Sequence, residues 1–120
     1  MLFFNGAIFD GFKPLPDGHA LLVEGARIKD IGPISQFAGY SGERFDMAGA
    51  TLLPGLIDCH VHLAMSGDGK AVSAKGNNHA ALTLQALSNA QATLKGGITA
   101  LRDCGGIDHV EFAVRDACNS

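Results

Sequence analysis

Short apolar runs alternate with turn residues over the first 53 positions of the chain. The Asn-Gly pair at 5–6 separates apolar runs at 2–4 and 7–9, and a polar residue followed by glycine favours a tight turn between two strands. Two more short strands are expected at 44–46 and 51–53. This pattern predicts a small β layer that is too thin to form a complete domain by itself.

The clearest element of this layer is a hairpin. Residues 20–23 and 27–31 are rich in apolar side chains and flank a turn that contains Gly25, as two paired strands do. The second run alternates: Ile28 and Ile31 are apolar, and we expect Lys29 and Asp30 to point outward. The whole region should therefore pack as a small antiparallel sheet, separate from the strands that follow.

The hydrophobic pattern changes after the Pro-Gly pair at 54–55. Residues 56–62 form a largely apolar run, which is typical of a buried parallel strand, and a glycine-rich loop follows from 64 to about 78. From 80 to 95 the apolar residues recur with a helical period, and one of the two asparagines at 77–78 can cap the start of this helix. The expected packing stripe consists of Leu84, Leu87, Gln91 and Leu94.

A second strand and a second helix complete the pattern. Residues 98–104 predict a strand and its end, and Asp108 with Glu111 forms a near capping box for a helix that starts at His109. The order strand, helix, strand, helix is the start of a parallel α/β architecture. The second helix is expected to bury Val110, Ala113, Val114 and Ala117.

Two strand–helix units cannot cover both faces of a parallel sheet. A (β/α)8 barrel of the TIM type needs roughly 200 to 250 residues, whereas this chain has 120. We therefore interpret the chain as an N-terminal fragment. Residues 1–53 would be part of one domain, and residues 54–120 the first two βα units of an incomplete barrel.

Composition and charge exclude several classes of function. Hydrophobic residues make up 47% of the chain and charged residues 18%, which is an ordinary globular balance. The net charge of −3 gives no attraction to nucleic acid or to anionic lipid. The N-terminal residues have neither the basic start of a signal peptide nor the length of a membrane span. Three cysteines are an odd and sparse set for a disulfide framework, so we expect a cytoplasmic protein.

Candidate chemistry lies at the end of the first strand after the Pro-Gly pair. Because side chains alternate along a strand, Asp58, His60 and His62 should share one face. Cys59 and Val61 should point to the other face. Two imidazoles about 7 Å apart along a strand can lean toward a common point and bind one metal ion. Asp58 lies one step deeper, where its carboxylate could hydrogen-bond a ligand imidazole or a neighbouring strand.

The position of this His-x-His pair favours a metal site over two solvent-exposed polar residues. The pair lies at the C-terminal end of a strand that begins an α/β series, where such folds place their active sites. The glycine-rich loop follows directly, as a lid or substrate loop would. His19, His79 and His109 are by contrast expected to be solvated surface residues.

The remaining polar residues give weaker signals. A zinc finger is rejected because Cys59 points away from the two histidines and no Cys-x-x-Cys pair occurs; Cys59 is interpreted as a small buried residue. Arg102 and Asp103 alternate at a strand end, so only one can point inward. An inward Asp103 could support a metal ligand, and the alternative is a salt-bridge or turn role. The glycines at 105–106 are too weak a pattern for a phosphate site.

The stretch Leu-Pro-Gly-Leu-Ile-Asp-Cys-His-Val-His-Leu at 53–63 resembles the signature of the amidohydrolase superfamily, Pro-Gly-(Leu/Phe)-Ile-Asp-x-His-x-His. Residues 23–28 resemble the early hairpin of this family, and residues 95–106 resemble the second barrel strand of its imidazolonepropionase and prolidase-like branch. The resemblance implies a (β/α)8 TIM-type barrel preceded by part of a small β-sandwich domain. It also implies one or two divalent metals, usually zinc, with His60 and His62 as ligands of the more buried ion.

The activity that the resemblance implies is hydrolysis of an amide-type C–N bond by metal-activated water. The substrate would be a dipeptide such as Xaa-Pro or a small cyclic amide, and the remaining ligands and the general base would lie beyond residue 120. A deaminase or another hydrolase on the same scaffold stays open, as does a catalytically silent assembly subunit. Expected partners exclude nucleic acid and membranes and include the rest of the barrel polypeptide, while a homo-oligomer stays open.

Overall fold

The chain divides into two compact units, Met1–Pro54 and Gly55–Ser120, in a computed structural model that describes residues 1–65, 67 and 78–120. The division falls beside the Pro-Gly pair at which the sequence pattern changes. Most of the predicted glycine-rich loop lies outside the described residues. None of the helices in the described part of the chain is long and apolar enough to cross a membrane.

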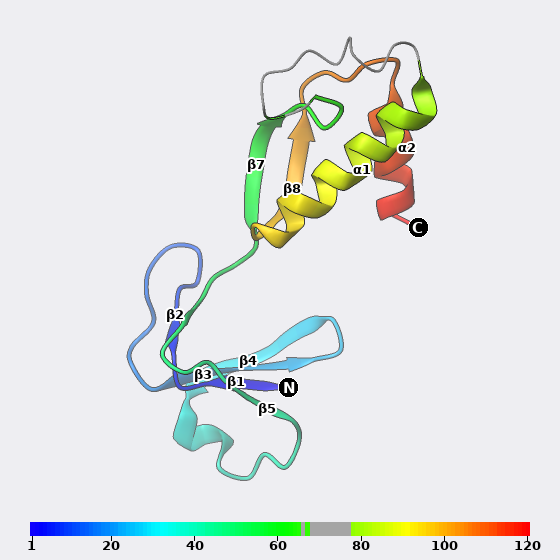
Figure 1. Cartoon of the computed structure of the whole chain (residues 1–120). Coiled ribbons are helices and arrows are strands. Elements are labelled where there is room, and N and C mark those ends of the chain that lie inside the picture. The colour runs from blue at the N-terminus through cyan, green and yellow to red at the C-terminus, as the bar shows by residue number, and fades with distance from the viewer. Residues whose placement is uncertain (66, 68–77) are drawn as a thin grey trace. The chain divides into compact units, whose positions relative to one another are not determined.

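The first unit is a β structure, as its alternating pattern predicts. One sheet has the strand order β4-β3-β1-β5, and β2 pairs with β6 in a second, two-stranded sheet (Figure 1). The predicted hairpin is confirmed as the antiparallel pair β3 and β4. The elements are β1 (Leu2–Phe4), β2 (Ala7–Ile8), β3 (His19–Glu24), β4 (Arg27–Pro33), the 3-10 helix η1 (Ile34–Phe37), β5 (Arg44–Asp46) and β6 (Thr51–Leu52).

The expectation of a purely antiparallel sheet is wrong. β1 pairs with β5 in parallel, and β2 pairs with β6 in parallel. Parallel neighbours need a connection of a dozen or more residues, and the β3–β4 hairpin together with η1 supplies such a connection between β1 and β5. The hairpin therefore lets the chain return beside β1 in the same direction.

Strand β3 contributes to the core of this unit on both of its faces. Ala20 and Leu22 pack with Leu2 and Phe37 in one cluster, whereas Leu21 belongs to a second cluster. The two isoleucines of β4 are not buried, since Ile28 is 63% exposed and Ile31 38%. β4 is the edge strand of its sheet, so its side chains have fewer neighbours to pack against. The second cluster consists of Ile8, Leu21 and Met47.

The second unit has the predicted order of strand, helix, strand and helix. Its two strands pair in parallel, α1 packs against β8, and α2 packs against α1 (Figure 1). Asn78 caps α1 as predicted, because its Oδ1 accepts a hydrogen bond from the N–H of Ala81 at 3.1 Å. Gly97, with φ of 90°, follows the end of that helix. The elements are β7 (Leu56–Val61), α1 (His79–Lys95), β8 (Ile98–Asp103) and α2 (Val110–Cys118).

The predicted packing stripe of α1 is confirmed at Leu87, which packs half-buried against the core, and is wrong at its other two leucines. Leu84 is 68% exposed and Leu94 60%, whereas Leu82 and Ala86 are fully buried. Alanine and leucine occur around the whole circumference of α1, so its period does not distinguish one side as the core side. The core that α1 enters is formed by Leu63, Ala64, Leu82, Ala86, Val110 and Val114.

Helix α2 departs from the prediction at its start. Val110 and Val114 are buried as expected, but Ala113 and Ala117 are exposed. The predicted capping box does not form, because the N-cap residue is His109, which makes no side-chain cap bond. Asp108 and His109 both adopt left-handed backbone angles, with φ of 53° and 60°, and this turns Asp108 away from the position of a capping residue.

Strand β7 is parallel to β8, but the burial expected for it is wrong in this unit. Leu56 is 52% exposed and Ile57 71%. The sheet of the second unit has only two strands among the described residues, so each strand keeps one edge without a neighbour. The apolar side chains of Leu56 and Ile57 are therefore not buried within the unit itself.

Candidate metal centre

The two histidines of the motif lie together at the C-terminal end of β7. His60 is the next-to-last residue of the strand, and His62 is the first residue after it. Their ring centroids are 5.2 Å apart, and the ring planes are nearly perpendicular at 77°. His60 is exposed and His62 is half-buried. The strand thus presents two imidazoles on one side of its end, as its period of two predicts.

A backbone carbonyl fixes which nitrogen of His62 carries the proton. His62 Nδ1 lies 2.8 Å from the carbonyl oxygen of Gly105, in the loop after β8. A carbonyl oxygen can only accept a hydrogen bond, so Nδ1 must donate it. In the neutral ring Nε2 then keeps its lone pair, which is the form in which an imidazole binds a metal. This contact therefore prepares Nε2 of His62 as a ligand atom.

The two carboxylates singled out in the sequence contact backbone groups instead of an imidazole. Asp58 Oδ1 accepts a hydrogen bond from the N–H of His60 at 3.0 Å. Asp103 Oδ2 accepts from the N–H of Leu63, and its Oδ1 accepts from the N–H of Gly105, both at 3.0 Å. Asp103 thus makes the turn contact that was one of its expected roles, and its support of a metal ligand stays a prediction.

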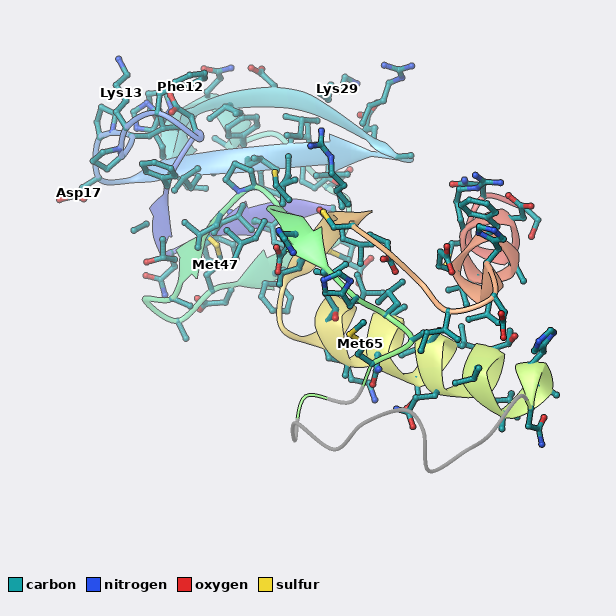
Figure 2. All side chains as sticks on the ribbon, turned by 90° about the horizontal axis from the view of Figure 1, so that it is seen from above. Phe12, Lys13, Asp17, Lys29, Met47 and Met65 are labelled. Carbon is teal, nitrogen blue, oxygen red and sulfur yellow. The ribbon has the colours of Figure 1, made fainter. Side chains whose placement is uncertain are left out.

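The sequence analysis missed one polar residue beside the pair. Asn89 of α1 donates hydrogen bonds from Nδ2 to the carbonyl oxygens of Leu63 and Met65, at 2.7 and 2.8 Å. Met65 is labelled in Figure 2, close to the ribbon of α1. An asparagine in the interior of a helix was the available signal, because such a residue favours local turns and caps over helix interiors.

The other histidines are not brought to this pair. The side chain of His79 is 64% exposed and its Nε2 lies 3.1 Å from Asp108 Oδ2, while the side chain of His109 is 82% exposed. Both are surface residues, as expected. His19 differs from the expectation, since it is half-buried and its Nδ1 is buried without a hydrogen-bond partner in the described part of the chain.

The prediction that Cys59 is buried is wrong, since its side chain is exposed. The register of β7 with β8 shifts between Asp58 and Val61, around this residue. Cys104 lies nearby, with Sγ 3.6 Å from the carbonyl oxygen of Cys59. This contact joins the two strand ends but contributes no further donor to the imidazole pair.

The pair fits part of a metal site. Zinc in catalytic sites takes three protein ligands, and imidazole nitrogen is among the commonest of them. Within residues 1–65, 67 and 78–120, no group of three or more His, Cys, Asp or Glu side chains is placed to hold an ion. His60 and His62 would therefore supply two ligands of a site whose other ligands are not among the described residues.

A groove of about 840 Å³ runs along α1, β8 and α2 and reaches Leu63 and Gly105 beside the pair. Its apolar walls include Leu87, Leu94 and Phe112, and neither His60 nor His62 lines it. A groove between two helices and a strand edge has the shape that a further structural element would fill, and it does not extend the candidate metal centre.

Comparison with known proteins identifies the family. The model of the amidohydrolase family matches residues 51–120. An imidazolonepropionase from Cereibacter sphaeroides is 41% identical over 58 residues, which cover 48% of this chain and 14% of that protein. A crystal structure of a Xaa-Pro dipeptidase with bound methionine superposes with a TM-score of 0.79 at 27% identity, covering 98% of this chain and 29% of the dipeptidase.

A second solved structure, titled an amidohydrolase, superposes with a TM-score of 0.73 at 30% identity, over 98% of this chain and 28% of that one. The chain thus spans less than a third of the length of the relatives that it matches. The family match covers both strand–helix units and the His-x-His motif. The chain belongs to the amidohydrolase superfamily and resembles its imidazolonepropionase- and prolidase-like branch.

Proposed function

We propose that this chain provides the first two metal ligands, His60 and His62, of a metal-dependent hydrolase that cleaves amide-type C–N bonds. The observation that carries the proposal is the pair of imidazoles at the end of β7, one of them held by Gly105 with its Nε2 left for a ligand bond. Members of the amidohydrolase family generally use divalent metals, and zinc is the ion that best suits imidazole ligands of this kind.

The names of the relatives support a C–N bond as the target. Imidazolonepropionases are among the curated proteins that match, and one matched structure is a Xaa-Pro dipeptidase. We propose a small cyclic amide or a dipeptide as the substrate class. A bound zinc ion supplies an activated water and polarises the carbonyl group under attack.

The residues of this chain would act by placing the two ligands. His60 is exposed at the strand end, and its ring packs edge-on against the ring of His62. His62 is restrained by the Gly105 carbonyl, and the two residues that follow it, Leu63 and Ala64, are buried in the core of the unit. Rigid placement of ligands lowers the cost of assembling a metal site. The other ligands and the group that transfers the proton would come from polypeptide outside these 120 residues.

We further propose that the second unit is the start of a (β/α)8 barrel and that the first unit is part of a small β-sandwich. Exposed apolar residues support this assignment in both units, because Ile57 and Leu84 of the second unit and Ile28 of the first lack cover. The proposed full-length protein would be cytoplasmic and would contain the strands and helices that cover these residues.

The same family match is compatible with two other functions. A deaminase on this scaffold would use the same two histidines, since the fold does not fix the substrate. A silent assembly subunit would have no need of both ligands or of the contact that prepares His62. The ordered His62–Gly105 contact therefore favours an enzyme over a silent subunit.

The test is made on the full-length protein. Metal content is measured after purification without added metal, and hydrolysis is assayed with a panel of Xaa-Pro dipeptides, other dipeptides and imidazolone-type cyclic amides, with amino-nucleobases included for deaminase activity. We expect about one to two equivalents of zinc, as for other sites with water-activating zinc, and turnover of at least one amide substrate. A metal-free, inactive protein that cannot be reconstituted with zinc would overturn the proposal.

A further inference from the structure

One carboxylate holds the backbone on both sides of the His62–Gly105 contact. Asp103 is the last residue of β8, and its Oδ2 accepts the N–H of Leu63, the residue directly after His62. Its Oδ1 accepts the N–H of Gly105, whose carbonyl oxygen accepts the hydrogen bond from the His62 ring. Asp103 thus holds both the backbone next to His62, which donates the hydrogen bond, and the peptide of Gly105, which accepts it.

Helix α1 holds the same stretch of backbone from the opposite side. The carbonyl oxygen of Leu63 accepts a hydrogen bond from Asn89, so the N–H of this residue is fixed to β8 and its C=O to α1. Gln85 donates to Asn89 Oδ1 at 3.0 Å, which orients the amide with its NH2 group toward the backbone. The chain after His62 therefore cannot shift without the loss of several hydrogen bonds.

The loop after β8 would otherwise have considerable freedom. It contains two successive glycines, Gly105 and Gly106, and Gly105 has a φ of 154°, which few other residues adopt. A glycine peptide can rotate its carbonyl group at little cost, and a rotated Gly105 would no longer accept the hydrogen bond from Nδ1 of His62. The bond from the Gly105 N–H to Asp103 opposes that rotation.

We propose that Asp103 is a positioning residue for His62. By fixing the Gly105 peptide and the Leu63 peptide together, it keeps the His62 proton on Nδ1 and aims Nε2 at the proposed metal. The inference rests on the proposed function in which His62 is a ligand. Asp103 would thus control the tautomer and the direction of the His62 ring without contacting the ring itself.

The test replaces Asp103 by asparagine in the full-length protein. The amide keeps one acceptor oxygen, but its NH2 group faces one of the two backbone N–H groups, so one bond is lost. The matched control is Asp108→Asn, which removes an exposed carboxylate of the same loop that pairs with His79. Histidine ring nitrogens are observed by NMR in the metal-free proteins at a pH of about 8, where an ordinary imidazole is neutral, and zinc affinity is measured by chelator competition.

We expect the wild-type protein and the Asp108→Asn control to carry the His62 proton on Nδ1. In Asp103→Asn the proton should be divided between the two nitrogens, and zinc should bind about 10- to 100-fold more weakly, which is the usual effect of losing a group that orients a ligand. If Asp103→Asn does not fold, Asp103→Glu serves instead, because its longer side chain keeps the charge but cannot reach both N–H groups in the same way.

A purely structural role for Asp103 has a different result. A folded variant with a lower melting temperature but an unchanged His62 tautomer and unchanged zinc affinity would overturn the inference. If the tautomer moves in the variant while the wild-type protein binds no zinc, Asp103 does position the ring and the proposed hydrolase function is the part that is wrong. The metal-free NMR measurement therefore separates the two failures.

Discussion

Replacing His60 and His62 separately by alanine in the full-length protein should produce two different kinds of loss. Both variants remove one ligand of the proposed site, so tight zinc binding should disappear and turnover should fall by several orders of magnitude, because water activation and carbonyl polarisation depend on the ion. His60 is exposed, whereas His62 is half-buried and bonded to Gly105. The two variants should therefore differ in the stability of the metal-free protein.

The size of that difference follows from the contacts. The His62–Gly105 hydrogen bond contributes about 0.5–1.5 kcal/mol to the free energy of unfolding, and it is lost in His62→Ala alone. The contact between the two rings is lost in both variants and cancels in the comparison. His60→Ala should thus change the free energy of unfolding by no more than about 0.5 kcal/mol, as for other exposed positions, and His62→Ala should lower it by about 1 kcal/mol more.

The assay combines zinc analysis, hydrolysis of the best substrate and urea unfolding of the metal-free proteins. His79→Ala and His109→Ala are the controls, because these side chains are exposed and lie apart from the pair. Near-normal turnover of either ligand variant in a zinc-replete assay would refute the assignment of the metal ligands. Equal stability of metal-free His60→Ala and His62→Ala would refute the argument that the Gly105 contact contributes to the fold.

Three further predictions concern packing. Leu82→Ala should lower the free energy of unfolding of the full-length protein by about 2–5 kcal/mol, because Leu82 is 1% exposed and packs in the core of the second unit. Chemical denaturation checks this, and a loss well below that range would show that the wrong side of α1 has been assigned to this core. Asn78→Ala should cost about 1 kcal/mol through loss of the helix cap, and Asn78→Ser should restore most of it in the same measurement. Residues 1–120 expressed alone should neither melt cooperatively as a monomer nor hold stoichiometric zinc, because apolar surface and the outer edge of β8 are uncovered in the described part of the chain. Size-exclusion chromatography, calorimetry and metal analysis test this. A zinc-loaded monomer that melts cooperatively would contradict it.

The sequence alone predicts the order and type of the strands and α-helices in both units, but not the 3-10 helix η1. The hairpin around Gly25 and the helix that begins after Asn78 follow from turns and caps, whose hydrogen bonds join residues close together in the chain. The proximity of His60 and His62 is local in the same sense. Two residues on one face of a strand are neighbours wherever that strand is placed, and their ring centroids are 5.2 Å apart.

The hydrophobic period does not predict which side of a segment is buried when the segment is apolar on more than one side. Leu82 and Ala86 face the core of the second unit, although the sequence equally allows Leu84 and Leu94 to do so. The parallel partnership of β1 with β5 is equally unpredictable from either strand, because each is three residues long and carries no mark of its neighbour. Such choices depend on which surfaces the rest of the chain presents.

The surroundings of His62 are decided by tertiary structure alone. Its ring contacts Gly105, 43 residues away, and the backbone that follows it is held by Asp103 and Asn89, which lie 40 and 26 residues from Leu63. These contacts form because β7 and β8 pair in parallel and end at the same edge, while α1 packs against that edge. A carboxylate or an amide in the sequence shows that a hydrogen bond is needed. Only the packed elements determine which backbone group lies within 3 Å of it, because that distance depends on the register of two strands and the placement of a helix.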